Sequence, residues 1–230
     1  MKLSIKEEQM SQSALLGLFL ASSGGFLDAY TYLLRGGKFA TMQTGNMIML
    51  AYKIFSSEPI AACYYLIPIA SFFIAIVIAV LLEKALKTVT KFHWRQLIVL
   101  LEMLIIIGTA FVPVKDNLNW LANMLVSFVA GLQLESFKKV KGIAFASTMC
   151  TGNLKSLAER VASFFTGFSK EKLLEALVFL GVILAFIGGV FVGYYSSSAY
   201  ANLGILFCLP FLFVSDLLMY IKPVEEKKAA

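Results

Sequence analysis

The chain has 230 residues, of which 59% are hydrophobic and only 15% are charged, and its formal net charge is +6. A soluble domain carries about a quarter charged residues, so this chain has too little charge to cover a surface that faces water. Its basic residues stand in short connections between apolar stretches, which is typical of membrane proteins and argues against nucleic-acid binding. We therefore predict an all-α bundle of transmembrane helices whose main partner is the lipid bilayer.

Six apolar segments reach the length of roughly 20 residues that a transmembrane helix needs. In chain order they cover 12–34, 60–82, 96–113, 118–137, 173–195 and 200–221. Two further apolar stretches are shorter or more polar, and there we expect short helices over 39–55 and 147–168. The first segment also fits a secretory signal, but its removal would leave the first half of the chain without a leading helix, so we interpret it as a retained span.

Positive charge distinguishes two arrangements of the short helices, because Lys and Arg concentrate in cytoplasmic loops. If neither short helix crosses the bilayer, 16 Lys and Arg residues lie on one side and 4 on the other; if both cross, the split is about 9 to 11. The asymmetry favours two re-entrant helices, with both chain termini in the cytoplasm. The second short helix carries Lys155 and Glu159 on one face, so it must also meet water in a vestibule or at the interface.

A six-residue motif occurs twice at an offset of 107 residues. Residues 41–46 read Thr-Met-Gln-Thr-Gly-Asn, and residues 148–153 read Thr-Met-Cys-Thr-Gly-Asn. The same register makes nine of the thirty positions from 24 to 53 identical to their counterparts, where chance gives about two. We infer a duplicated membrane domain, with a first repeat over 1–113 and a second over 114–230. Three spans per repeat invert the second repeat in the bilayer, and inverted repeats place binding sites at their interface.

The two repeats contain the polar groups that a binding site needs. A helix that starts near Asn46 would direct free N–H groups toward the midplane, where they suit an anion, while the Thr and Asn oxygens suit a cation or a polar solute. Asp28 and Glu135 are paired by the repeat and lie in apolar helices, where ionised carboxyl groups are costly and usually mark a pathway. The candidate binding residues are Asp28, Thr41, Gln43, Thr44, Gly45, Asn46, Glu135, Thr148, Thr151, Gly152 and Asn153.

Structural roles remain open for the same residues. Thr-Gly-Asn can cap a helix or let helices pack closely. Asp28 can pair with Arg35 at a helix end, and Glu135 can pair with Lys138 or Lys139. Glu102, inside the third span, is a weaker candidate.

Three functions fit these features. The first is a small secondary transporter or permease for a solute or ion that the sequence does not identify, the second is a channel that uses the twin Thr-Gly-Asn loops, and the third is a non-transporting substrate-binding subunit or scaffold. A homo-oligomer is compatible with each. His93 is the only histidine, and no His or Cys cluster has metal-ligand spacing, so we expect no enzyme activity, no catalytic residue, no metal and no cofactor.

The pattern of motifs resembles the YoaK-like family of bacterial inner-membrane proteins, which is grouped under a domain of unknown function. The resemblance rests on Gly25-Phe26-Leu27-Asp28-Ala29, Phe39, Gln43-Thr44-Gly45-Asn46, Gly131-x-Gln133 and Thr148-x-x-Thr151-Gly152-Asn153. It covers nearly the whole chain. Leu134 departs from the pattern, since that family often has Asn there. The resemblance implies a multi-pass protein of the bacterial cytoplasmic membrane and supplies no substrate.

Overall fold

The computed structural model describes residues 13–86, 94–140 and 143–220. The elements of this part of the chain are α1 (Ala14–Leu34), α2 (Gln43–Phe55), α3 (Pro59–Leu86), α4 (Trp94–Ala110), α5 (Asn119–Ser136), β1 (Lys139–Val140), β2 (Ile143–Ala144), α6 (Cys150–Gly167), α7 (Lys170–Tyr200), the 3-10 helix η2 (Ala201–Cys208) and α8 (Leu209–Tyr220). Helices lie in all eight predicted places. The predicted helical bundle is therefore confirmed, apart from the small antiparallel hairpin in which Lys139 pairs with Ala144.

Three helical stretches of the described chain are long and apolar enough to cross a membrane. They are Ala14–Leu34, Pro59–Leu86 and the continuous stretch Lys170–Tyr220, which comprises α7, η2 and α8. Within the segment predicted as a span over 200–221, the first part is the 3-10 helix η2 and the rest is α8. Ala201 takes a positive φ of 50° at the start of η2, which interrupts the α-helical hydrogen bonding at the end of α7.

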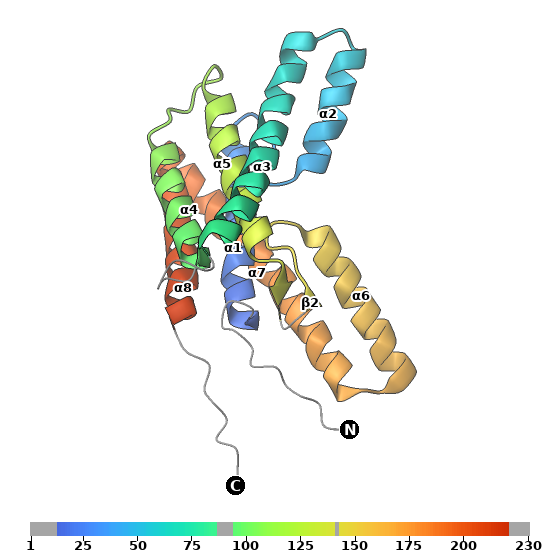
Figure 1. The fold of residues 1–230 in the computed structure, drawn as a ribbon. Coiled ribbons are helices and arrows are strands. Elements are labelled where there is room, and N and C mark those ends of the chain that lie inside the picture. The colour runs from blue at the N-terminus through green and yellow to red at the C-terminus, as the bar shows by residue number, and fades with distance from the viewer. Residues whose placement is uncertain (1–12, 87–93, 141–142, 221–230) are drawn as a thin grey trace.

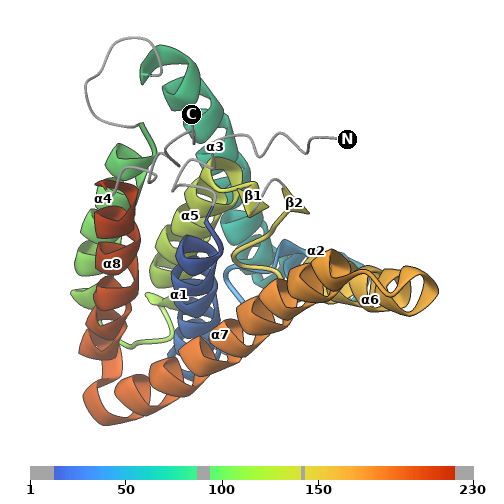
Figure 2. The same ribbon diagram turned by 90° about the horizontal axis from the view of Figure 1, so that it is seen from below.

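The helices pair in two similar groups. α1 packs along α7, and α5 packs along α3; α2 lies beside α3, and α6 lies beside α7. α2 and α6 occupy one side of the bundle, away from α4 and α8 (Figure 2). α2 and α6 extend in opposite directions from the region where they begin (Figure 1).

Small residues allow the close approach in both long pairs. A side chain at Gly131 of α5 would place its Cβ 2.6 Å from the carbonyl oxygen of Phe72 on α3. Ser71 Oγ donates across this contact to the Met124 carbonyl at 2.8 Å. In the other pair, Ser22 Oγ of α1 donates to the Ala185 carbonyl of α7 at 3.0 Å. Glycine and serine at the contact are typical of helix packing in membranes.

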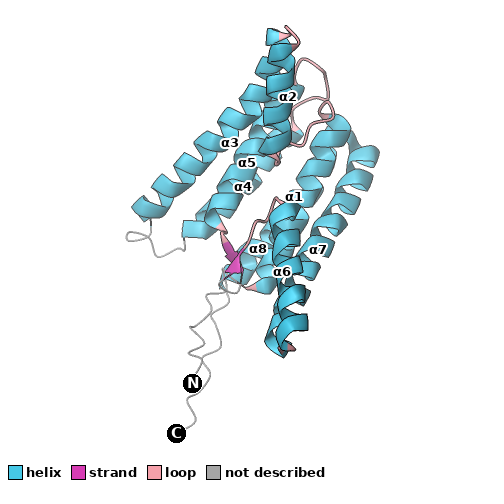
Figure 3. Cartoon of the chain, turned by 90° about the vertical axis from the view of Figure 1, so that its right-hand side faces the viewer, coloured by secondary structure: helices cyan, strands magenta, loops and turns pink. Residues whose placement is uncertain are grey.

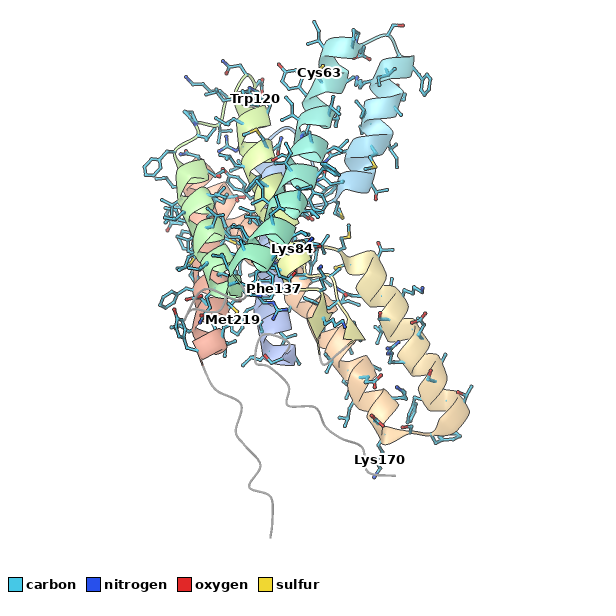
Figure 4. All side chains as sticks on the ribbon, in the orientation of Figure 1. Cys63, Lys84, Trp120, Phe137, Lys170 and Met219 are labelled. Atoms are coloured by element: carbon cyan, nitrogen blue, oxygen red, sulfur yellow. The ribbon has the colours of Figure 1, made fainter. Side chains whose placement is uncertain are left out.

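The ends of the helices define two ends of the bundle. α1 begins and α8 finishes at the same end (Figure 3). Cys63 and Trp120 lie toward the opposite end from Met219 and Lys170 (Figure 4). The terminal residues on which the predicted cytoplasmic placement partly rests, 1–12 and 221–230, lie outside the described residues, as does the connection 87–93.

Candidate functional site

The two copies of the motif meet where α2 and α6 begin. The hydroxyl oxygen of Thr41, just before α2, lies 3.4 Å from the backbone carbonyl oxygen of Thr148, just before α6. Both threonines are completely buried. Thr148 Oγ1 is itself without a hydrogen-bond partner among the described residues. The duplicated segments are therefore in direct contact, although 107 residues separate them in the chain.

Asp28 anchors the first of the two segments. It lies inside α1 and is only 3% exposed. Its carboxyl group accepts one hydrogen bond from the Thr41 backbone N–H at 3.2 Å and one from the Thr41 hydroxyl at 2.8 Å. Thr41 thus links the buried acid of α1 to the start of α6.

Asp28 is not paired with Arg35, which was one alternative from the sequence. The Arg35 guanidinium is fully buried and donates to the Tyr30 hydroxyl and to the carbonyl oxygens of Val112 and Pro113. These contacts tie the end of α1 to the connection between α4 and α5. Arg35 therefore stabilises the packing at the end of α1 and does not pair with Asp28.

Asn46 and Asn153 make the same contact in the two copies of the motif. The Asn46 side-chain amide donates to the carbonyl of Phe39 at 3.4 Å, and that of Asn153 donates to the carbonyl of Ala146 at 2.8 Å. In each case the acceptor stands seven residues earlier, and the two acceptors are themselves 107 residues apart. The shared function of these asparagines is to close the loop in front of a helix.

The expected helix starts are wrong by several residues. α2 begins at Gln43 rather than 39, and α6 begins at Cys150 rather than 147. The residues at the N-cap are Met42 and Met149, neither of which makes a side-chain capping bond. Because α2 begins at Gln43, Asn46 lies inside the helix and does not cap it. Its side chain bonds to the preceding loop instead.

The remaining motif residues divide by burial. Gln43 is buried, donates to the Ala40 carbonyl at 2.8 Å, and accepts from the Asn46 side chain at 2.9 Å. The other four are exposed on the first turns of their helices: Thr44, Gly45, Thr151 and Gly152. A Cβ at either glycine would meet nothing within 4 Å. These four residues leave the beginning of α2 and of α6 accessible.

Glu135 does not share the environment of Asp28. Near the end of α5, it forms an ion pair with Lys138 and borders a polar cavity of about 180 Å³. The cavity is also lined by Glu83, Trp94, Arg95, Ser136, Phe137 and Lys139. The expected pair of acids in one central site is therefore not formed, and Glu135 takes the helix-end role that was its alternative. The repeat aligned Asp28 with Glu135, but the short hairpin after α5 gives the second repeat a different chain path from the first.

Three buried polar residues, Ser23, Gln133 and Glu102, are not among the binding residues predicted from the sequence. Ser23 of α1 donates to the Gln133 side-chain oxygen of α5 at 3.1 Å, and Gln133 donates to the Leu20 carbonyl at 3.0 Å. Glu102 is completely buried in α4. Among the described residues, no three His, Cys, Asp or Glu side chains lie close enough to hold a metal ion.

Comparison with known proteins places the chain in a family. Residues 16–218 match the family described as "Protein of unknown function (DUF1275)". The chain is 28% identical over 191 residues to the "UPF0700 transmembrane protein YoaK" of Bacillus subtilis (strain 168), which covers 79% of this chain and 82% of that protein. No solved structure matches the chain. The resemblance noted from the motifs is thus confirmed, and the chain belongs to the DUF1275 family, a family of unknown function with a transmembrane member.

Proposed function

We propose that the protein is a small secondary transporter or permease whose substrate site lies where α2 and α6 begin. One observation carries this proposal, the buried junction in which the Thr41 hydroxyl donates to Asp28 at 2.8 Å and lies 3.4 Å from the Thr148 carbonyl oxygen. A carboxyl group inside an apolar bundle is costly, and such groups usually mark substrate or ion pathways. The starts of two helices add partial positive charge and free N–H groups at the same place.

The helix pairs support an inverted repeat over 1–113 and 114–230. In this repeat, α5 is the counterpart of α1, α7 that of α3, and α6 that of α2. Replacing each helix by its counterpart turns the α1–α7 pair into the α5–α3 pair. It also turns the α2–α3 pair into the α6–α7 pair. The matching bonds of Asn46 and Asn153 follow the same exchange. In the proposed topology α1, α3, α4, α5, α7 and η2–α8 span the membrane. α2 and α6 enter it from opposite faces, with the chain termini in the cytoplasm.

This arrangement explains why a polar junction can form inside an apolar bundle. In membrane proteins, irregular backbone occurs at the depth of the bilayer where it is buried in protein or lines a cavity. Transporters place broken or half-length helices at the midplane, where their free N–H and C=O groups bind substrates or ions. The exposed hydroxyls of Thr44 and Thr151 stand on the first turns of such helices. We propose that they contact a small polar solute or ion together with Asp28.

The test begins with ligand-induced changes in the unfolding temperature of the detergent-purified protein. Sodium, potassium, chloride, phosphate, amino acids and sugars are added separately, and a stabilising compound is then followed into proteoliposomes. Asp28→Asn should weaken the stabilisation roughly tenfold or more in ligand concentration, because a hydrogen bond to a charged group contributes about 1.5–3 kcal/mol. Glu58→Gln is the control, since Glu58 is an exposed acid that pairs with Lys53.

Three results would count against a transporter with this site. A ligand whose effect is unchanged in Asp28→Asn would place binding elsewhere. Flux through proteoliposomes that does not saturate with concentration would indicate a channel. A second protein that copurifies in fixed stoichiometry, without transport by this chain alone, would indicate a subunit or scaffold.

A further inference from the structure

Glu102 is a buried acid that the proposed substrate site does not use. It lies in the middle of α4, on the face that carries Val99 and Ile106, and it is 0% exposed. Neither carboxyl oxygen has a hydrogen-bond partner among the described residues. Asp28 differs in this respect, because two donors from Thr41 satisfy it.

No positive charge from the surrounding helices compensates Glu102. α5, η2 and α8 pack against α4, α1 contributes to the same apolar cluster, and none of these four elements contains Lys, Arg or His. Arg35, directly after α1, is bound to Tyr30 and to the Val112 and Pro113 carbonyls. On α4 itself the basic residue is Arg95, two turns earlier, and it donates to the Ser136 carbonyl. On α3 the basic residue is Lys84, near the end of the helix.

The other titratable groups near α4 are also acidic or neutral. Cys208 of η2 is completely buried and close enough to Glu102 to interact with it electrostatically. Asp216 of α8 is buried and leaves one carboxyl oxygen without a partner. Glu83 of α3 and Glu135 of α5 line the polar cavity beside Arg95, and Asp28 of α1 is bound to Thr41. Each of these acids, if ionised, would oppose a negative charge at Glu102.

A carboxyl group without a counter-charge or a hydrogen-bond donor is far less costly to bury as a neutral acid than as a carboxylate. A metal ion would suit Glu102 less well than a proton, because a metal ion needs several oxygen atoms around it and Glu102 lies in an apolar cluster. The chemistry therefore selects a proton. We propose that Glu102 is a proton-binding site of the bundle, which holds its proton in the packing described here and exchanges it when α4 and η2 separate.

The element beside Glu102 is suited to such movement. η2 is a 3-10 helix of eight residues, whereas 3-10 runs longer than three or four residues are uncommon and often mark a hinge. An apolar groove of about 770 Å³ is lined by residues of α4, η2 and α8, so these elements do not fill all the space between them. If η2 moves, water can reach Glu102, the acid O–H bond breaks, the proton passes to that water, and a carboxylate remains.

This inference depends on the proposed transport only for its role in a transport cycle, because proton binding is measurable without any substrate. Infrared spectroscopy of the purified protein detects the C=O stretch of a protonated carboxyl group. At neutral pH the wild type should show such a band that disappears in Glu102→Gln and persists in Glu135→Gln, whose acid is paired with Lys138. Glu102→Leu also removes the acid, and it replaces Glu102→Gln in the comparison if that variant does not fold.

Transfer to D₂O then distinguishes a proton site from an inert buried acid. The Glu102 band should shift to lower frequency as deuterium replaces the proton. Identical carboxylic-acid bands in wild type and both Glu102 variants would show that Glu102 is ionised, which overturns the inference. A Glu102 band that never shifts in D₂O would also overturn it, because the proton would then not exchange. If the band and its exchange are present while no substrate is transported, proton binding stands and the proposed function fails.

Discussion

Asn46 and Asn153 each connect the first turn of a helix to the loop in front of it, and this contact can be tested by mutation. Asn46→Ala and Asn153→Ala remove partly buried hydrogen bonds to the carbonyls of Phe39 and Ala146. Each change should lower the free energy of unfolding by about 0.5–1.5 kcal/mol, which is the net contribution of a typical intramolecular hydrogen bond. Thermal unfolding of the purified variants measures the effect.

Thr44→Ala and Thr151→Ala are the matched controls for the asparagines. Both threonines stand in the same motif copies but are exposed, so their loss should change stability by less than about 0.5 kcal/mol. Equal losses for the threonine and asparagine variants would contradict the loop-closing role. A separate loss of ligand stabilisation in the threonine variants would instead support their proposed contact with substrate.

At the scale of single residues, the sequence predicted which positions matter more accurately than what they do. The repeat singled out Asn46 and Asn153, and each makes the same contact with a carbonyl seven residues earlier. Their expected capping role was wrong, because an Asn side chain can bond either to the helix start or to the loop before it, and spacing does not distinguish these. The Asp28–Glu135 pairing also failed, since alignment cannot show that a hairpin diverts the chain after α5.

The contact between α3 and α5 predicts opposite effects for two glycine-to-alanine changes. Gly131→Ala places a Cβ 2.6 Å from the Phe72 carbonyl oxygen, so the helices must move apart, at a cost of about 1–3 kcal/mol. Gly108→Ala in α4 meets nothing within 4 Å and should stabilise that helix by about 0.5–1 kcal/mol. Unfolding temperatures of the two variants should therefore differ in sign. A Gly131→Ala variant as stable as Gly108→Ala would show that the α3–α5 contact is looser than described.

Whole elements were predicted well where length and apolar character decide the outcome. α1, α3, α5 and α7 lie close to their predicted ranges, because an apolar run of about 20 residues allows little besides a helix in a membrane. The break at η2 was missed, because it begins at Ala201 and not at a glycine or proline that would mark it in the sequence.

At the scale of the whole molecule, the proposed duplication has a physical explanation. A single unit of three spans and one half-length helix leaves the start of that short helix without a partner. In the proposed inverted repeat, two such units bring the segments before both short helices together, so that Thr41 meets Thr148. Asp28 and Glu135 have different partners, so the two proposed copies are not equivalent at this position. A difference of this kind is expected if one half binds an ion or proton and the other half serves packing.

The re-entrant topology predicts a specific pattern of labelling in a cysteine-free variant, in which Cys63, Cys150 and Cys208 are replaced. Lys38→Cys and Ser56→Cys flank α2 and should both react with a membrane-impermeant maleimide added to intact cells. Lys139→Cys and Lys170→Cys flank α6 and should react only after the membrane is opened. The reason is that each short helix enters and leaves the bilayer on one face.

Lys115→Cys, in the exposed connection between α4 and α5, provides the positive control for the outer face in this experiment. Opposite accessibility of Lys38→Cys and Ser56→Cys would mean that α2 crosses the membrane, and opposite accessibility of Lys139→Cys and Lys170→Cys would mean the same for α6. Two crossings would restore an even number of spans in each half, and the halves would then be parallel. The junction of Thr41 and Thr148 would no longer lie at the midplane, so the substrate site proposed there would lose its basis.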